Sequence, residues 1–142
     1  MRTEFDPDTL THRVDLTMPG EVGAVPPTVA RLMEAVGEMP CAKGKEFEIE
    51  LALTEALANA VEHGCKRDSG KTVRVTAECD PARGMLIVVR DPGEGFDPAT
   101  VPSPIVGERV FSEGGRGIFL INQLMDEMRF ERGGTEIWMV KR

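Results

Sequence analysis

The segment ELALTEALANAVEHG, residues 50–64, constrains the fold of this chain more than any other stretch. It is typical of a helix, and Glu55, Asn59 and His63 recur every four residues along it. At about 100° per residue, those three side chains fall within roughly 80° of arc. Leucine, alanine and valine occupy the other side, so the pattern predicts a helix whose back lies in a core. Its open face then presents a carboxylate, an amide and an imidazole together.

The periodicity of apolar residues predicts the other elements. Alternation of apolar and polar residues is typical of half-buried strands, whereas recurrence every three or four residues is typical of amphipathic helices. Pro26 and Pro27 suit the first turn of a helix, and Gly64 stands where a left-handed C-terminal cap belongs. The expected helices are 26–36, 46–63 and 117–128, and the expected strands are 12–18, 72–78, 85–89, 127–131 and 136–140.

The order of these elements predicts an α+β fold. Because hairpins dominate, we expect a two-layer α/β sandwich whose sheet is mixed or mainly antiparallel, with helices on one face. Residues 1–142 are expected to form a single domain that begins with a loose segment at 1–11. Residues 91–116 form one long loop rich in proline and glycine, and a loop of that length is usually functional, often a lid.

Composition and charge exclude several classes of function. The net charge of −7 argues against nucleic acid as a direct partner, because phosphate backbones require an excess of Lys and Arg. The apolar runs are too short to cross a bilayer, and the acidic N-terminus lacks the apolar region of a signal peptide. We therefore expect a cytoplasmic protein without membrane contact. In that compartment Cys41, Cys65 and Cys79 are expected to be reduced thiols.

Two glycine clusters follow the central helix in the sequence. The first runs from Asp91 to Gly95 after a buried strand, where a carboxylate can accept a hydrogen bond from an amine such as that of adenine. The second, Gly114 to Gly117, begins a helix, where free N–H groups and the helix dipole favour an anion. Taken singly, each cluster also fits a tight turn or a flexible lead-in to a helix, and the helix face also fits a solvated polar stripe.

Taken together, and in this order, the motifs EALANAVEHG, DPGEGF, GGRGI and the late Gly134-Thr135 pair resemble the GHKL ATPases. That superfamily joins gyrase, histidine kinases and the DNA mismatch-repair ATPase. The nearer likeness is to its small stand-alone branch, the anti-sigma factors that are also serine/threonine kinases. The resemblance covers residues 12–141 and implies a Bergerat ATP-binding fold with a mobile ATP lid at 92–116.

The resemblance also implies a role for each motif residue. Glu55 would be the general base of phosphotransfer, Asn59 would ligate Mg²⁺, and Asp91 would recognise the adenine amine of ATP. A single amide oxygen suffices for the metal, because Mg²⁺ takes its other ligands from phosphate and water. The remaining ATP-binding residues implied by the resemblance are His63, Gly64, Gly93, Gly95, Phe96, Gly114, Gly115, Arg116, Gly117, Ile118 and Thr135.

One position departs from the family pattern. Some members carry an arginine just before the second glycine cluster, where it touches the terminal phosphate, whereas this chain has Glu113. Arg116 and Arg109 are the candidates to replace it. The departure bears on the kinase rate, since positive charge stabilises the transferring phosphoryl group.

The leading hypothesis is a serine/threonine kinase in a partner-switching system. It would phosphorylate a small STAS-type antagonist of an anti-sigma factor and bind a sigma factor or another regulatory target. The likeness further implies a homodimer through the N-terminal strand and helix. Val14, Leu16 and Met18 share one side of that strand, and we expect them to face the core rather than a partner.

Three alternatives remain open from the sequence. The first is an ATP-sensing binding or switch protein without catalysis. The second is the catalytic part of a histidine autokinase, although the chain has only His12 and His63 as histidines. The third is a generic α+β domain that binds no nucleotide.

Overall fold

The computed structural model describes residues 11–66, 68–93 and 114–142. Residues 1–10 of the expected loose start and residues 94–113 of the expected lid therefore lie outside the described residues, whereas residues 114–116, expected in the lid, are helical. The helical elements are α1 (Val25–Val36), α2 (Glu46–Asn59), η3 (Ala60–Gly64) and α3 (Gly114–Leu124), with short 3₁₀ turns η1 (Val22–Ala24), η2 (Pro40–Ala42) and η6 (Arg132–Gly134). The strands are β1 (His12–Pro19), β2 (Thr72–Asp80), β3 (Gly84–Arg90), β4 (Glu127–Glu131) and β5 (Glu136–Lys141).

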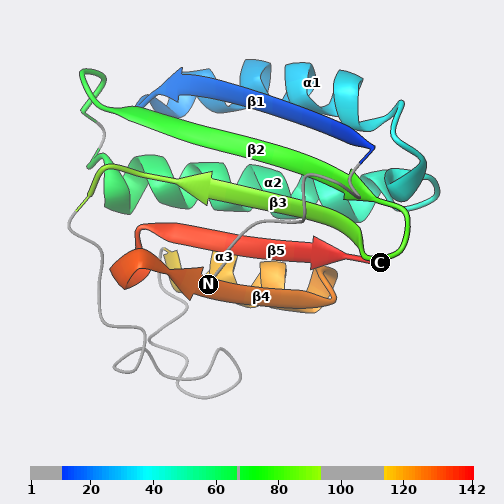
Figure 1. Ribbon diagram of the computed structural model, residues 1–142. Helices are drawn as coiled ribbons and strands as arrows, with labels where there is room; N and C mark the ends of the chain where they lie inside the picture. Colours follow the sequence, from blue (N-terminus) through cyan, green and yellow to red (C-terminus); the bar gives the residue numbers. More distant parts are fainter. Residues whose placement is uncertain (1–10, 67, 94–113) are drawn as a thin grey trace.

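The described strands form one five-stranded sheet in the order β1-β2-β3-β5-β4. Each neighbouring pair is antiparallel, so the sheet contains no parallel pair among these strands. Figure 1 shows α1, α2 and α3 on the same face of the sheet. The predicted two-layer α+β sandwich is thereby confirmed.

The core lies between the helices and the sheet. Met18 is buried and Val14 and Leu16 pack against the same core, as expected for that side of β1. Full burial of one large apolar side chain contributes about 1.5–3 kcal/mol, so a layer of them holds the helices on the sheet. The largest fully buried side chains include Leu32, Ile49, Leu53, Leu57, Val73, Met85, Ile87, Ile121 and Met139.

The central helix ends differently from the prediction. α2 passes into a π-helical turn at Ala60–Gly64, in which the Cys65 N–H donates to the Ala60 carbonyl at 2.9 Å. Gly64 is not among the residues with positive φ, so the predicted left-handed cap is wrong. π-turns are rare and are frequent at functional sites.

The third helix is shifted toward the N-terminus relative to its predicted range of 117–128. It begins at Gly114, so the second glycine cluster forms its first turn rather than a lead-in. Glycine is tolerated there because the first-turn N–H groups have no partner within the helix in any case. The helix ends at Leu124 because the Asp126 N–H turns to the Val140 carbonyl, 2.8 Å away, and β4 follows.

Two of the three cysteines are not the reduced thiols that were expected. Cys41 in η2 and Cys79 in β2 form a disulfide, with their Cα atoms 5.7 Å apart, whereas Cys65 is free and buried. The expectation failed because it rested on spacing and compartment. The two residues are 38 positions apart and meet only when η2 packs over the end of β2.

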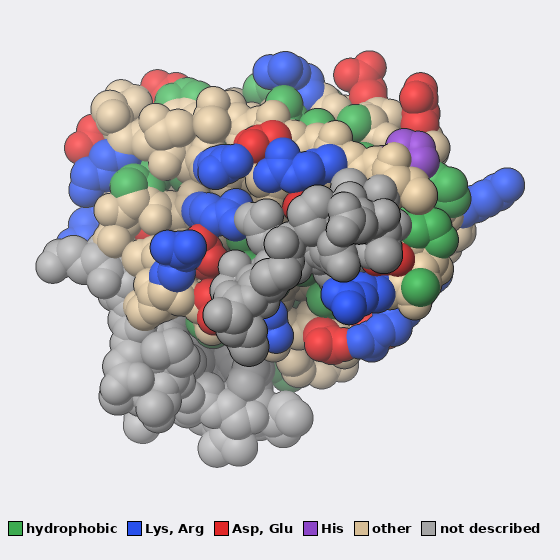
Figure 2. Space-filling model, in the orientation of Figure 1, with side chains coloured by type: hydrophobic (Ala, Val, Ile, Leu, Met, Phe, Trp, Pro, Cys, Tyr) green, Lys and Arg blue, Asp and Glu red, His purple; other side chains and the backbone are tan. Residues whose placement is uncertain are grey.

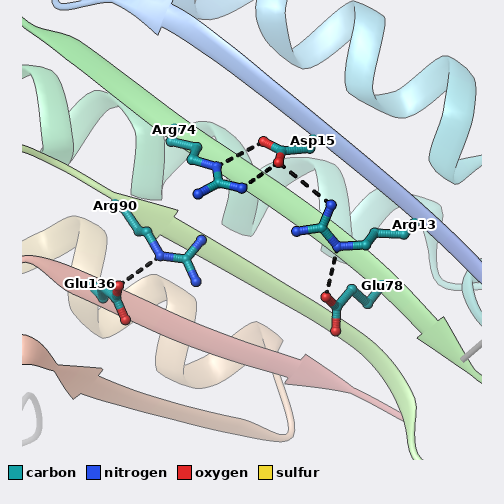
Figure 3. A network of polar contacts seen from close by, with 6 residues as sticks. All are labelled: Arg13, Asp15, Arg74, Glu78, Arg90 and Glu136. Atoms are coloured by element: carbon teal, nitrogen blue, oxygen red, sulfur yellow. Dashed lines mark hydrogen bonds and ion pairs between the residues drawn. The ribbon is translucent and has the colours of Figure 1, made fainter. Parts of the chain in front are cut away.

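The face of the sheet opposite the helices is charged. Figure 2 views this face and shows Lys/Arg and Asp/Glu side chains side by side across it. In Figure 3, Arg74 Nε donates to Asp15 at 3.0 Å and Arg13 Nε donates to Glu78 at 3.1 Å. The hydrogen bond from Arg74 is the main cause that lowers the pKa of Asp15 below its ordinary value. A small apolar cluster of Leu86, Val88 and Trp138 lies between these charges and β4.

Candidate functional site

Asp91 is held at the end of β3 by two backbone contacts. Its N–H donates to the Thr135 carbonyl at 2.9 Å, and its Oδ1 accepts from the Gly93 N–H at 2.8 Å. Among the described residues, no hydrogen bond reaches Oδ2. Burial raises the pKa of the Asp91 carboxyl above its ordinary value of 3.8, and the bond from Gly93 offsets part of that rise. The result is a fixed, partly buried acceptor, one oxygen of which has no partner among the residues that the structure describes.

Gly64 brings the end of the central helix onto this carboxylate. A Cβ atom on Gly64 would overlap the carboxyl group of Asp91, and one on Gly93 would lie 2.6 Å from the Gly64 carbonyl oxygen. Both positions therefore require glycine for close approach rather than for a special φ. This contact joins η3 to the strand end that carries Asp91.

Glu55 lies on α2, the helix that continues into η3, and contacts α3. A Cβ atom on Gly117 would lie 3.1 Å from Glu55 Oε2 and 3.7 Å from Glu55 Cβ. The first turn of α3 therefore packs directly over the carboxylate. Because helix first turns favour anions, an acid and an anion-binding turn are placed together here.

Asn59, one turn beyond Glu55, carries an unsatisfied amide. Its Oδ1 is buried and has no hydrogen-bond partner in the described part of the chain. Leaving a buried acceptor unpaired costs about 1–3 kcal/mol, and such an atom in a native structure needs an explanation. An amide oxygen is a suitable ligand for a hard cation such as Mg²⁺, so the residue present fits the implied metal.

The other residues predicted from the sequence lie at or near this site or outside the described part of the chain. Thr135 reaches Asp91 through its carbonyl, while its hydroxyl donates to the Arg132 carbonyl at 2.9 Å. His63 is exposed at the end of the helix, and Ile118 is partly buried in α3. Gly114, Gly115 and Arg116 lie in the first turn of α3, and Gly95, Phe96, Arg109 and Glu113 lie outside the described residues.

Sequence reasoning missed an ion pair that supports the site. Arg90, directly before Asp91, donates from Nε to Glu136 at 2.7 Å, and Glu136 directly follows Thr135. Glu136 is only 3% exposed and also accepts from Trp138 Nε1 at 3.0 Å. The sequence did carry a signal for this ion pair. Arg90 and Glu136 are oppositely charged neighbours of Asp91 and Thr135, and the antiparallel pairing of β3 with β5 places them opposite each other.

Cys65 is a second residue that the motifs did not indicate. It is fully buried next to Gly64, and Gly20 packs against it, since a Cβ atom there would lie 2.6 Å from Cys65 Cβ. Burial chiefly, and then the charge of Asp91, raise the pKa of the Cys65 thiol. The residue therefore forms part of the wall behind Asp91 as a neutral side chain.

The fold and this site suit an ATP-binding domain, and comparison with known proteins identifies its family. Residues 18–141 match the sequence profile of the histidine kinase-like ATPase domain. The chain therefore belongs to the histidine kinase-like ATPase family, which confirms the resemblance drawn from its motifs.

Three individual relatives are named as serine-protein kinases. The chain is 34% identical over 104 residues to serine-protein kinase RsbW of Bacillus subtilis, an alignment that covers 66% of this chain and 62% of that protein. It is 32% identical over 138 residues to the protein of the same name from Halalkalibacterium halodurans, covering 90% of this chain and 82% of the relative. For the Staphylococcus epidermidis protein the identity is 35% over 100 residues, covering 65% and 62%. The chain thus spans slightly less than two thirds of the first and third relatives.

Within the described residues, no helix combines the length and the apolar character needed to cross a membrane.

Proposed function

We propose that this chain is an ATP-dependent protein serine/threonine kinase that also acts as an anti-sigma factor. The observation that carries the proposal is the shared wall of α2 and η3. That wall places Glu55 against the first turn of α3 and Gly64 against Asp91. The similarity to proteins named serine-protein kinase supports the same reading.

ATP would bind across the junction of these three segments. The free oxygen of Asp91 would accept a hydrogen bond from the adenine amine, with Gly93 allowing the base to approach the backbone. The N–H groups at the start of α3 would hold the phosphates. Magnesium, held by Asn59, would neutralise phosphate charge when bound.

In the phosphotransfer step, Glu55 acts as the general base. Its carboxylate accepts the proton of a serine or threonine hydroxyl as that oxygen attacks the terminal phosphoryl group and ADP leaves. The substrate oxygen gains a phosphate, and Glu55 carries the proton until solvent removes it. The packing of Gly117 on Oε2 supports this role, because the base lies beside the turn that would hold the phosphates.

The partners follow from the class of relatives. We propose a small STAS-type antagonist as the phosphorylation substrate, and a sigma factor or a similar regulator as the target bound in the alternative state, all in the cytoplasm. A homodimer through the β1 and α1 region belongs to the same proposal. β1 is an edge strand of the sheet, and edge strands can pair with a second chain.

Phosphotransfer by a Glu55→Gln variant tests the proposal. The protein is incubated with ATP, Mg²⁺ and a panel of candidate antagonists, with Glu50→Gln as the control, because Glu50 is exposed on the same helix. Loss of a general base should slow transfer by about 10²–10⁴-fold while ATP affinity is kept. Equal transfer by Glu55→Gln would remove the base role. ATP binding by the wild type without transfer to any antagonist would favour a non-catalytic ATP-sensing switch.

A further inference from the structure

A surface cavity lies at the end of the sheet opposite the ATP-binding site. It has a volume of about 300 Å³, within the range of small-ligand sites. It is formed where η2 and the residue before α2 face the turn between β2 and β3 and the end of the chain. Because Gly84 begins β3 and Asp91 follows its last residue, the length of that strand separates the two sites.

Three of the eight residues that line the cavity are basic. Lys45, Arg83 and Arg142 contribute to its wall, and no Asp or Glu among the described residues does. Arg142 is paired with Glu127, while Lys45 has no ion-pair partner in the part of the chain that the structure describes. On a chain with net charge −7, the positive charge of Lys45 at this cavity favours a small anion.

One of the two disulfide-bonded cysteines, Cys41, lines the same cavity. Cys41 is partly exposed and lines it, whereas Cys79 is 0% exposed. We therefore expect an attacking thiolate to reach Cys41 rather than Cys79. Exchange rates depend on which sulfur is attacked, so the burial of Cys79 favours attack on Cys41.

We propose that this cavity is a thiol-exchange site that takes anionic low-molecular-weight thiols. The cations hold the anionic thiol while its sulfur attacks Cys41 Sγ. A new bond forms to Cys41, the bond to Cys79 breaks, and the Cys79 sulfur leaves with the electron pair and takes up a proton. A second thiol then attacks the mixed disulfide, which frees Cys41 and releases the oxidised small disulfide. Two thiols are oxidised for each protein disulfide reduced.

Thiol exchange at Cys41 removes a covalent link between the connector before α2 and the sheet. The disulfide ties the connector before α2 to β2, and the enclosed stretch from Cys41 to Cys79 carries Glu55 and Asn59. Reduction releases that tie without altering any residue of the site. The proposal does not depend on kinase activity, so either can fail alone.

Charge selectivity of the reducing agent tests the proposal. The rate of disulfide reduction is measured with glutathione, which is anionic, and with 2-mercaptoethanol, which is neutral. Each rate is corrected for the fraction of thiolate and then divided by the rate of the same thiol on a small model disulfide. We expect the wild type to favour glutathione by about threefold, the effect of one cation at about 6 Å in water, and to lose that preference at high salt. Lys45→Gln should lower the preference about threefold. Lys43→Gln, an exposed neighbour outside the cavity, should leave it unchanged.

The site of attack gives a second readout. Quenching the reaction with acid, alkylating free thiols and mapping the peptides should place the glutathione adduct on Cys41. An adduct on Cys79, equal effects of Lys45→Gln and Lys43→Gln, or three reactive thiols in the denatured protein before any reductant is added would each overturn the proposal.

Discussion

Asp91 combines partial burial with an incomplete set of hydrogen bonds. A buried carboxylate is usually offset by several donors, but the described residues supply Asp91 with the Gly93 N–H alone. Its pKa is therefore raised, and the folded state bears a cost for the ionised form. Groups perturbed in this way cluster at functional sites, which agrees with a role in adenine recognition.

Replacing Asp91 by asparagine should increase stability and weaken ATP binding. The folded-state pKa exceeds 3.8, so the contribution of Asp91 to stability is fully present below that pH and is lost as the pH rises through the folded pKa. Asn does not titrate, so urea denaturation should show Asp91→Asn gaining on the wild type across that window. ATP affinity should fall about tenfold, since a bond to a charged acceptor is lost. Unchanged affinity would remove Asp91 from the adenine pocket.

Spacing along the chain predicted where residues lie more reliably than why they are needed there. Glu55 and Asn59 were placed on one helix face by their spacing alone, and the structure has them there. Gly64 was predicted to be a left-handed cap, whereas the structure requires glycine there because of a close contact. Glycine is selected either for positive φ or for the absence of Cβ, and only the contact with Asp91, 27 positions away, distinguishes the two.

At the scale of elements, the π-helical turn η3 connects the part of the site on α2 to the part around Asp91. It places Gly64 against Asp91, while the α-helical part carries Glu55 beneath α3. Hydrophobic periodicity predicted the strands and two of the helices closely. It did not predict the π-turn or the start of α3, because both depend on contacts with distant segments rather than on local apolar spacing.

A methyl group at Gly64 should disrupt the contact between η3 and Asp91. In Gly64→Ala the new Cβ overlaps the Asp91 carboxyl group, so we expect a loss of about 1–3 kcal/mol in unfolding free energy and much weaker ATP binding. Gly23→Ala is the matched control, since a Cβ there meets nothing within 4 Å. It should change stability by less than about 0.5 kcal/mol. Similar behaviour of the two variants in denaturation and ATP titration would contradict the packing described.

On the scale of the whole molecule, one disulfide links the helical layer to the sheet. It joins η2, between α1 and α2, to the end of β2. The sequence predicted the two layers and the antiparallel sheet, because these follow from patterning along the chain. It did not predict the disulfide, since the packing of η2 on β2 is a property of the assembled fold.

Removing the disulfide should lower stability by an amount set by the loop that it closes. For residues 38 apart, loop entropy in the unfolded state accounts for about 4 kcal/mol, and measured losses are typically about 2–4 kcal/mol. Cys41→Ser should show this loss in urea denaturation. Dithiothreitol should produce a similar loss in the wild type and none further in the variant. A dithiothreitol effect that persists in Cys41→Ser would show that another group is responsible.

The central claim is that α2, the Asp91 turn and α3 together form one magnesium-dependent ATP site. Calorimetric titration with ATP, with and without Mg²⁺, tests it in the wild type, in Asn59→Ala and in Asn122→Ala, an exposed asparagine on α3 that serves as control. We predict that Mg²⁺ strengthens binding about tenfold or more, or about 1.4 kcal/mol, in the wild type and in Asn122→Ala. Asn59→Ala should keep the magnesium-free affinity and lose the increment. Absence of ATP binding, or a magnesium effect that survives in Asn59→Ala, would contradict the account.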